Sequence, residues 1–171
     1  MKELTQAMEK LLQHYRHDFL NILQVISGLA QLQKTDRLLS FIQKASMEIQ
    51  QFGRLIGCGD PRLALAVYEF LLQDFKGTYL LRVDGTLPLL KPEVLAALQM
   101  TLQSIQTSLQ QFPNGILHVF VSGGRRPSLT LSLADEANTR ALWQQAAAEA
   151  VKNGLEVVLN QGGGEVSLYL G

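Results

Sequence analysis

Apolar residues recur along the first 33 residues at the three- and four-residue spacing of an amphipathic α-helix. At about 100° per residue, with His17 set at zero, the apolar side chains fall on one continuous face. His17 lies at the centre of the opposite, polar face, so the pattern predicts one long helix from about Glu3 to Gln33 with His17 exposed. The apolar face consists of Leu4, Met8, Leu11, Leu12, Tyr15, Phe19, Ile22, Leu23, Ile26, Leu29 and Ala30.

A second helix is predicted from Thr35 or Asp36, either of which can serve as its N-cap, to about Leu55 or Ile56. The turn between the two helices is only a few residues long, so they must form an antiparallel hairpin. Two helices alone bury too little apolar surface to be stable. We therefore expect a homodimer in which two hairpins form a four-helix bundle. The second helix has a heptad-like seam of Leu38, Ile42, Ala45, Ile49, Phe52 and Ile56.

Beyond residue 58 the pattern changes to short strands, helices and turns, and this part contains all five prolines and eleven of the fourteen glycines. Asp60 as N-cap and Pro61 as first helical residue predict a helix that runs to about Phe75. Strand pairs separated by helices predict an α+β sandwich, a largely antiparallel sheet with helices on one face. We expect two domains, residues 1–58 and 59–171. Strands are predicted at 78–85, 116–122, 128–134, 155–160 and 165–170, and helices at 91–111 and 135–153.

Composition and charge narrow the function classes. Fifteen basic residues balance fifteen acidic ones, which removes the usual electrostatic argument for a nucleic-acid partner. No run approaches the roughly 18 apolar residues of a membrane span, and the N-terminus has no hydrophobic signal core. The single cysteine, Cys58, rules out an internal disulfide and a cysteine-based zinc site. We expect a cytoplasmic protein without a membrane partner.

The polar face around His17 is the leading candidate for chemistry. A neutral imidazole is a good nucleophile toward phosphorus, and Asp18 could orient or deprotonate it. Asn21 and Gln24 follow on the same face at i+4 and i+7, where they could bind a phosphoryl group or a partner. Gly28 removes a side chain from that face and leaves room for a partner to approach. The alternative is an ordinary solvated histidine, and periodicity alone does not separate the two.

Other candidates have simpler explanations. His14 and His17 could share a metal ion, but no acidic residue completes a site on that face. His118 alternates within a predicted strand and is read as structural, and Cys58 has no activating neighbour. The glycines at 123–124 and 162–164 precede neither a helix start nor a Gly-Lys-Ser/Thr motif, so hairpin turns explain them. Arg125 and Arg126 at one hairpin tip are read as a solvated turn.

The segment Arg16-His17-Asp18-Phe19-Leu20-Asn21, followed by Leu23-Gln24 and Gly28-Leu29, resembles the phosphoacceptor helix of the sporulation initiation phosphotransferase B family. It also resembles the related citrate/dicarboxylate-type sensor histidine kinases. The resemblance covers about the first 75 residues, and the remainder agrees in length and element order only. It implies a dimerising helical hairpin followed by a degenerate domain similar to the ATPase domain of histidine kinases. By the same resemblance His17 is the phosphoacceptor with Asp18 and Asn21 beside it, and Arg16, Leu20, Gln24 and Gly28 form part of a docking face.

Departures from the kinase motifs point to the phosphotransferase branch. Kinases of the group have asparagines in one helix of the ATPase domain, and Ser104 and Ser108 stand at the corresponding positions. Their Asp-x-Gly-x-Gly motif corresponds to a stretch from Asp135 in which Ala137 and Thr139 replace the glycines. These replacements remove an Mg²⁺ ligand and the close backbone approach to phosphates. We expect no ATP use and no cofactor bound by this chain, with Mg²⁺ supplied by the receiver-domain partner.

The expected function is therefore a histidine phosphotransferase in a bacterial phosphorelay, working between two response-regulator receiver domains in sporulation initiation. Two other classes stay open. One is an ATP-dependent sensor-type histidine kinase with an unusual nucleotide site. The other is a non-catalytic dimeric scaffold that binds receiver domains through His17 and its neighbours. The sequence does not identify the donor or the acceptor.

Overall fold

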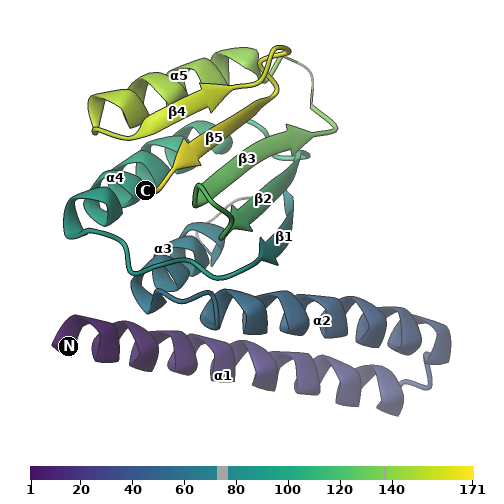
Figure 1. Cartoon of the computed structure of the whole chain (residues 1–171). Helices are drawn as coiled ribbons and strands as arrows, with labels where there is room; N and C mark the ends of the chain where they lie inside the picture. The colour runs from purple at the N-terminus through teal and green to yellow at the C-terminus, as the bar shows by residue number, and fades with distance from the viewer. Residues whose placement is uncertain (73–76, 137) are drawn as a thin grey trace.

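The computed structural model describes residues 1–72, 77–136 and 138–171 of the 171-residue chain. It has the α+β architecture that the sequence predicts: a long helical hairpin, followed by a five-stranded sheet and three further helices (Figure 1). The hairpin projects beyond the remainder of the molecule, and its turn lies far from the sheet (Figure 1).

The hairpin consists of α1 (Lys2–Gln31) and α2 (Thr35–Ile56), which lie side by side and antiparallel as predicted (Figure 1). α1 ends two residues earlier than expected, because Gln33 adopts a positive φ of 55° that a right-handed helix cannot contain. The expected N-cap is also wrong. Thr35 and Asp36 are already helical, Lys34 occupies the N-cap position, and no side chain caps α2.

The entry to α3 (Pro61–Leu72) is fixed by a buried ion pair. The Oδ1 atom of Asp60 accepts a hydrogen bond from the backbone N–H of Arg62 at 3.0 Å, which confirms Asp60 as the N-cap. The Arg62 guanidinium donates to both carboxylate oxygens, at 3.1 and 2.8 Å, and the Leu90 N–H donates to Oδ2 at 2.8 Å. Burial opposes ionisation of Asp60, yet these hydrogen bonds outweigh it and lower its pKa. The predicted helix end, Phe75, lies outside the described residues.

The sheet has the strand order β1-β2-β3-β5-β4. Among the described strands, β1 and β2 alone pair in parallel and the other neighbours are antiparallel, so the largely antiparallel prediction is confirmed. Burial alternates along β2 and β3, with one face covered by helices and the other open (Figure 1). The elements are β1 (Thr78–Asp84), α4 (Pro92–Leu109), β2 (Ile116–Ser122), β3 (Ser128–Ala134), α5 (Arg140–Lys152), β4 (Glu156–Leu159) and β5 (Glu165–Tyr169).

The start of α5 differs from the prediction. The helix begins at Arg140, five residues after the predicted start at Asp135. Asp135 and Asn138 have positive φ angles of 61° and 63°, and such left-handed residues cannot stand in a right-handed helix. The predicted stop is confirmed, since Gly154 has a φ of 91° immediately beyond the helix C-cap.

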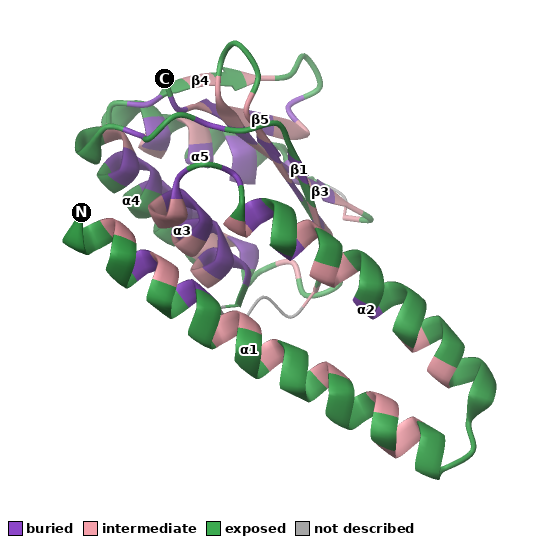
Figure 2. Ribbon diagram, turned by 60° about the horizontal axis from the view of Figure 1, so that its bottom comes forward, coloured by how far each residue is buried: buried purple, intermediate pink, exposed green. Residues whose placement is uncertain are grey.

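The two halves of the hairpin have different surroundings. We call Lys2–Asp18 of α1 together with residues 45–56 of α2 the hairpin base, and residues 19–44 the hairpin tip. At the base α1 packs against α3, and Leu11, Phe52 and Leu55 join one continuous buried cluster with the sheet and its helices. No side chain of the tip, all of which the structure describes, is buried (Figure 2). The predicted apolar face of the first helix is therefore buried by the chain itself only at the base.

Candidate functional site

His17 lies midway along α1, with 73% of its side chain exposed, as the helix phase predicts. Its Nδ1 atom is 3.2 Å from Oδ1 of Asp18 and 3.3 Å from the amide nitrogen of Asn21. The three predicted site residues therefore meet at one ring nitrogen. Among the described residues, Nε2 has no hydrogen-bond partner and is open to solvent.

The two contacts at Nδ1 make different demands on the ring, since the Asp18 carboxylate accepts a hydrogen bond whereas the Asn21 amide nitrogen donates one. An ionised carboxylate can only accept a hydrogen bond, so Asp18 requires the proton to be on Nδ1. A flip of the Asn21 side-chain amide then places its oxygen, in place of its nitrogen, toward this proton. The two amide atoms are assigned from the surrounding hydrogen bonds, so the flip is consistent with the same side-chain position. In this tautomer Nε2 carries the lone pair. The arrangement presents a nucleophilic nitrogen to an incoming group at the exposed face of the helix.

Tyr68 of α3 completes the group, although it is not among the site residues that the sequence predicts. Its hydroxyl donates a hydrogen bond to Oδ2 of Asp18, fifty residues away in the chain. The Tyr68 ring is buried against His14, with ring centroids 5.5 Å apart, and edge-on to Phe52 at 5.0 Å. Burial, followed by the bond to Asp18, raises the pKa of Tyr68 far above its ordinary value. In the sequence, Tyr68 is simply a tyrosine within an apolar helical stretch. That pattern does not indicate Asp18 as its hydrogen-bond partner.

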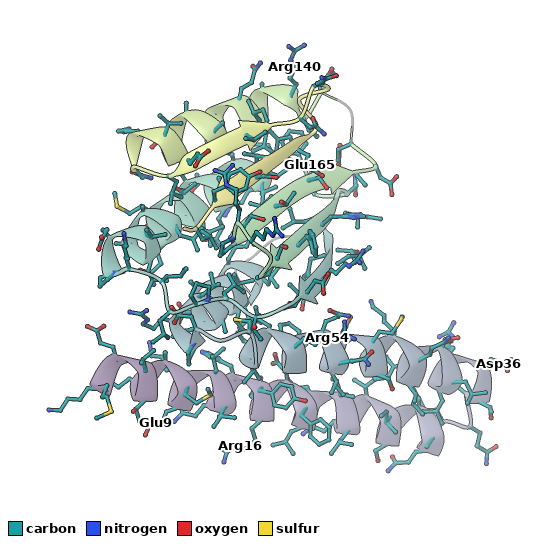
Figure 3. The ribbon with its side chains drawn as sticks, viewed as in Figure 1. Glu9, Arg16, Asp36, Arg54, Arg140 and Glu165 are labelled. Atoms are coloured by element: carbon teal, nitrogen blue, oxygen red, sulfur yellow. The ribbon has the colours of Figure 1, made fainter. Side chains whose placement is uncertain are left out.

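The predicted docking residues form a strip along the outer side of α1. Arg16, Leu20 and Gln24 are exposed, and with Gly28 they follow one another at four-residue spacing. Arg16 points away from the other elements of the molecule (Figure 3). A Cβ atom added at Gly28 would meet nothing within 4 Å. The chain itself therefore does not require glycine at this position.

His14, His118 and Cys58 do not share the arrangement found at His17. His14 is half-buried against Tyr68, and His118 is exposed on the open face of the sheet. In the part of the chain that the structure describes, no three His, Cys, Asp or Glu side chains are grouped to hold a metal ion. Cys58 is buried, and this burial raises the pKa of its thiol, so it is a poor nucleophile.

The counterparts of the kinase nucleotide motifs are distant from His17 in the sequence. Ser108 donates a hydrogen bond from Oγ to the Ser104 carbonyl at 3.4 Å, within α4 itself. Thr139 is buried at the start of α5, and Ala137 lies outside the described residues. The glycines at 123–124 and 162–164 join antiparallel strands, as predicted. Gly163 has a φ of 67°, a left-handed conformation that favours glycine, so the turn accounts for this glycine.

No helix in the described ranges is both long and apolar enough to cross a membrane. A model of the sensor-kinase SpoOB-type alpha-helical domain matches residues 1–58. Sporulation initiation phosphotransferase B of Bacillus subtilis (strain 168) is 30% identical over 142 residues, which cover 81% of this chain and 68% of that relative. Together with the hairpin and the sheet that follows it, these matches confirm the resemblance found in the sequence. The chain belongs to the sporulation initiation phosphotransferase B family.

Proposed function

We propose that this protein is a histidine phosphotransferase of a sporulation phosphorelay. A phosphorylated aspartate on one response-regulator receiver domain transfers its phosphoryl group to His17, and a second receiver aspartate removes it. The observation that carries this proposal is the exposed imidazole, held through Nδ1 by Asp18 and Asn21 with Nε2 open to solvent. The name of the Bacillus subtilis relative, a phosphotransferase of sporulation initiation, supports the same reaction class.

The reaction needs no net proton transfer. Nε2 attacks phosphorus in line, the Nε2–P bond forms, and the P–O bond to the receiver aspartate breaks to release its carboxylate. The imidazole retains its Nδ1 proton and becomes positively charged, and the carboxylate of Asp18 at 3.2 Å compensates that charge. The second transfer is the same step in reverse. Mg²⁺, which neutralises the charge on the transferred group, would be held by the acidic pocket of the receiver domain.

The docking strip supports the exchange of two partners at one atom. Receiver domains must reach Nε2 in turn, so the surface beside His17 has to be open and able to bind both. Arg16 supplies a cation, Leu20 an apolar contact and Gln24 a hydrogen-bonding group, all exposed along one side of α1. Gly28 extends the strip without a side chain.

The hairpin tip supports a homodimer. It exposes apolar side chains that a single chain does not cover, and pairing two hairpins into a four-helix bundle would bury them. We assign phosphoacceptance and dimerisation to residues 1–58, and support of the site to residues 59–171. The exposed apolar side chains of the tip that lie outside the docking strip include Phe19, Leu23, Val25, Leu32, Leu39 and Ile42.

A label-transfer assay tests the proposal. The purified chain is incubated with Mg²⁺ and either a receiver domain bearing labelled aspartyl phosphate or labelled ATP. We expect acid-labile, base-stable label from the receiver and none from ATP. The label should be lost in His17→Ala and kept in His118→Ala, which removes another exposed imidazole far from α1 in the sequence.

The other outcomes identify the competing classes. Label from ATP on His17 would make the chain a kinase. Binding of receiver domains without label on wild-type protein would make it a scaffold. In either case the relay function proposed here would be wrong.

A further inference from the structure

Asp18 is held from two sides, and only one of its partners belongs to the hairpin. Its Oδ1 atom faces Nδ1 of His17 at 3.2 Å, while Oδ2 accepts the hydroxyl hydrogen of Tyr68 from α3. His17, Asp18 and Tyr68 thus form a hydrogen-bonded chain that leads from the exposed imidazole into the buried cluster.

The Tyr68 end of this chain is rigid. The side chain is buried, and its ring contacts the rings of His14 and Phe52. Asp60 at the start of α3 accepts a hydrogen bond from the Leu90 N–H, which ties the helix to the remainder of the molecule. Asp18, by contrast, has 38% of its side chain exposed. Without an anchor, a half-exposed aspartate on a helix can choose other rotamers and turn its carboxylate toward water.

We propose that Tyr68 is a positioning residue for phosphoryl transfer: by fixing the carboxylate of Asp18 it keeps the proton of His17 on Nδ1 and the lone pair on Nε2. The inference rests on the proposed function for its effect on transfer, but its effect on the imidazole tautomer is independent of any partner. Tyr68 touches neither His17 Nε2 nor the group that would be transferred, so it acts only through Asp18.

The chemistry of the three groups supports this role. The pKa of Tyr68 is raised by burial and then by the bond to Asp18, so its hydroxyl stays protonated and donates to the carboxylate. A carboxylate bonded through one oxygen to a fixed donor presents the other oxygen in a fixed direction. That direction is toward Nδ1 of His17, where the carboxylate selects the protonated nitrogen.

The primary test is Tyr68→Phe, which retains the packed ring and removes the hydroxyl. In the full chain we expect phosphoryl transfer from a labelled receiver domain to slow by about tenfold, the typical effect of losing one hydrogen bond to a charged group. Nitrogen chemical shifts of the His17 ring, measured by NMR without a partner, should move from the Nδ1–H tautomer toward Nε2–H. An unchanged tautomer and an unchanged transfer rate would overturn the proposal.

Tyr79→Phe is the matched control. Tyr79 is a half-buried tyrosine of β1 whose pKa is raised to about 12 by burial and then by the charges of Glu48 and Asp18. Within the described ranges its hydroxyl makes no hydrogen bond to Asp18. Its loss should leave the His17 tautomer and the transfer rate unchanged. An equal effect of both variants would mean that tyrosine hydroxyls affect the site only through general packing.

A double-mutant comparison establishes the route. If Tyr68 acts through Asp18, adding Tyr68→Phe to Asp18→Ala should slow transfer no further than Asp18→Ala alone. Additive losses would show a separate role for Tyr68 and contradict the positioning proposal. If wild-type protein accepts no label at all, the proposed function fails, while the tautomer measurement still decides whether Tyr68 positions Asp18.

Discussion

The base and the tip of the hairpin have the same amphipathic pattern but opposite surroundings. At the base, Leu11 and Phe52 are buried against α3 and β1, whereas Leu23 and Ile42 at the tip are exposed. His17 lies at the boundary between them. Its Asp18 partner is anchored by Tyr68 of α3, the helix that packs on the base, and its open side continues toward Gln24 and Gly28 of the tip. His17 thus has a packed support from α3 on one side and an accessible surface of α1 on the other.

The largest expected effect comes from the ion pair that secures α3 behind the base. Asp60→Ala should lower the free energy of unfolding by about 4 kcal/mol at pH 7, because Arg62 remains partly buried without its partner and the N-cap is lost. Urea unfolding measures the change. The pKa of Asp60 is lowered in the folded protein, so its stabilisation is present above the ordinary aspartate pKa and disappears as pH falls through the lowered value.

The difference between wild type and Asp60→Ala should accordingly shrink in strongly acidic solution. A difference that stays constant down to pH 2 would contradict an ionised Asp60 in the folded state. A cost below about 1 kcal/mol at pH 7 would mean that the ion pair does not secure the base.

The second effect tests the packing of the base directly. Leu11→Ala removes a fully buried side chain and should cost about 3 kcal/mol of unfolding free energy. Leu12→Ala removes the same atoms from the next residue, which is exposed, and should cost less than about 0.5 kcal/mol. Similar costs for the two variants, measured by denaturant unfolding, would show that α1 does not pack on α3 in solution.

The third effect concerns the tip. The double variant Leu23→Gln/Ile42→Gln places polar groups on the exposed apolar surface and should raise the dissociation constant of the proposed dimer at least about tenfold. Analytical ultracentrifugation measures this shift. Val151→Gln alters an equally apolar, exposed residue on α5 and should leave association unchanged. A wild-type chain that is monomeric at all concentrations would refute the dimer.

The smallest effect separates folding from docking. Gly28→Ala should raise the free energy of unfolding by about 0.5 to 1 kcal/mol, since alanine favours the helix and the added Cβ meets no other atom. Gly53→Ala in α2 has equally open surroundings and should give the same gain. Phosphoryl transfer from a receiver domain should fall several-fold in Gly28→Ala alone. Equal transfer rates in the two variants would mean that the partner does not approach Gly28.

Much of the fold could be predicted because local patterns specify it. The hairpin follows from helical periodicity and a short turn, and β2 and β3 were placed at their observed limits from two apolar runs around a glycine-rich turn. The start of α5 was misplaced because nothing in the pattern from Asp135 onward indicates two left-handed residues. The N-cap of α2 differs from the prediction because Thr35 and Asp36, although of residue types that commonly cap helices, both lie inside the helix.

For the candidate site, the sequence by itself determined the exposure of His17 and the proximity of Asp18 and Asn21. These follow from the fixed rotation per residue of one helix, which needs no information from elsewhere in the chain. Only the tertiary structure decided that Tyr68 reaches Asp18 and that α3 covers the hairpin base. Such contacts join residues far apart in sequence, and their partners are selected by packing and burial of the whole chain, which no local pattern encodes.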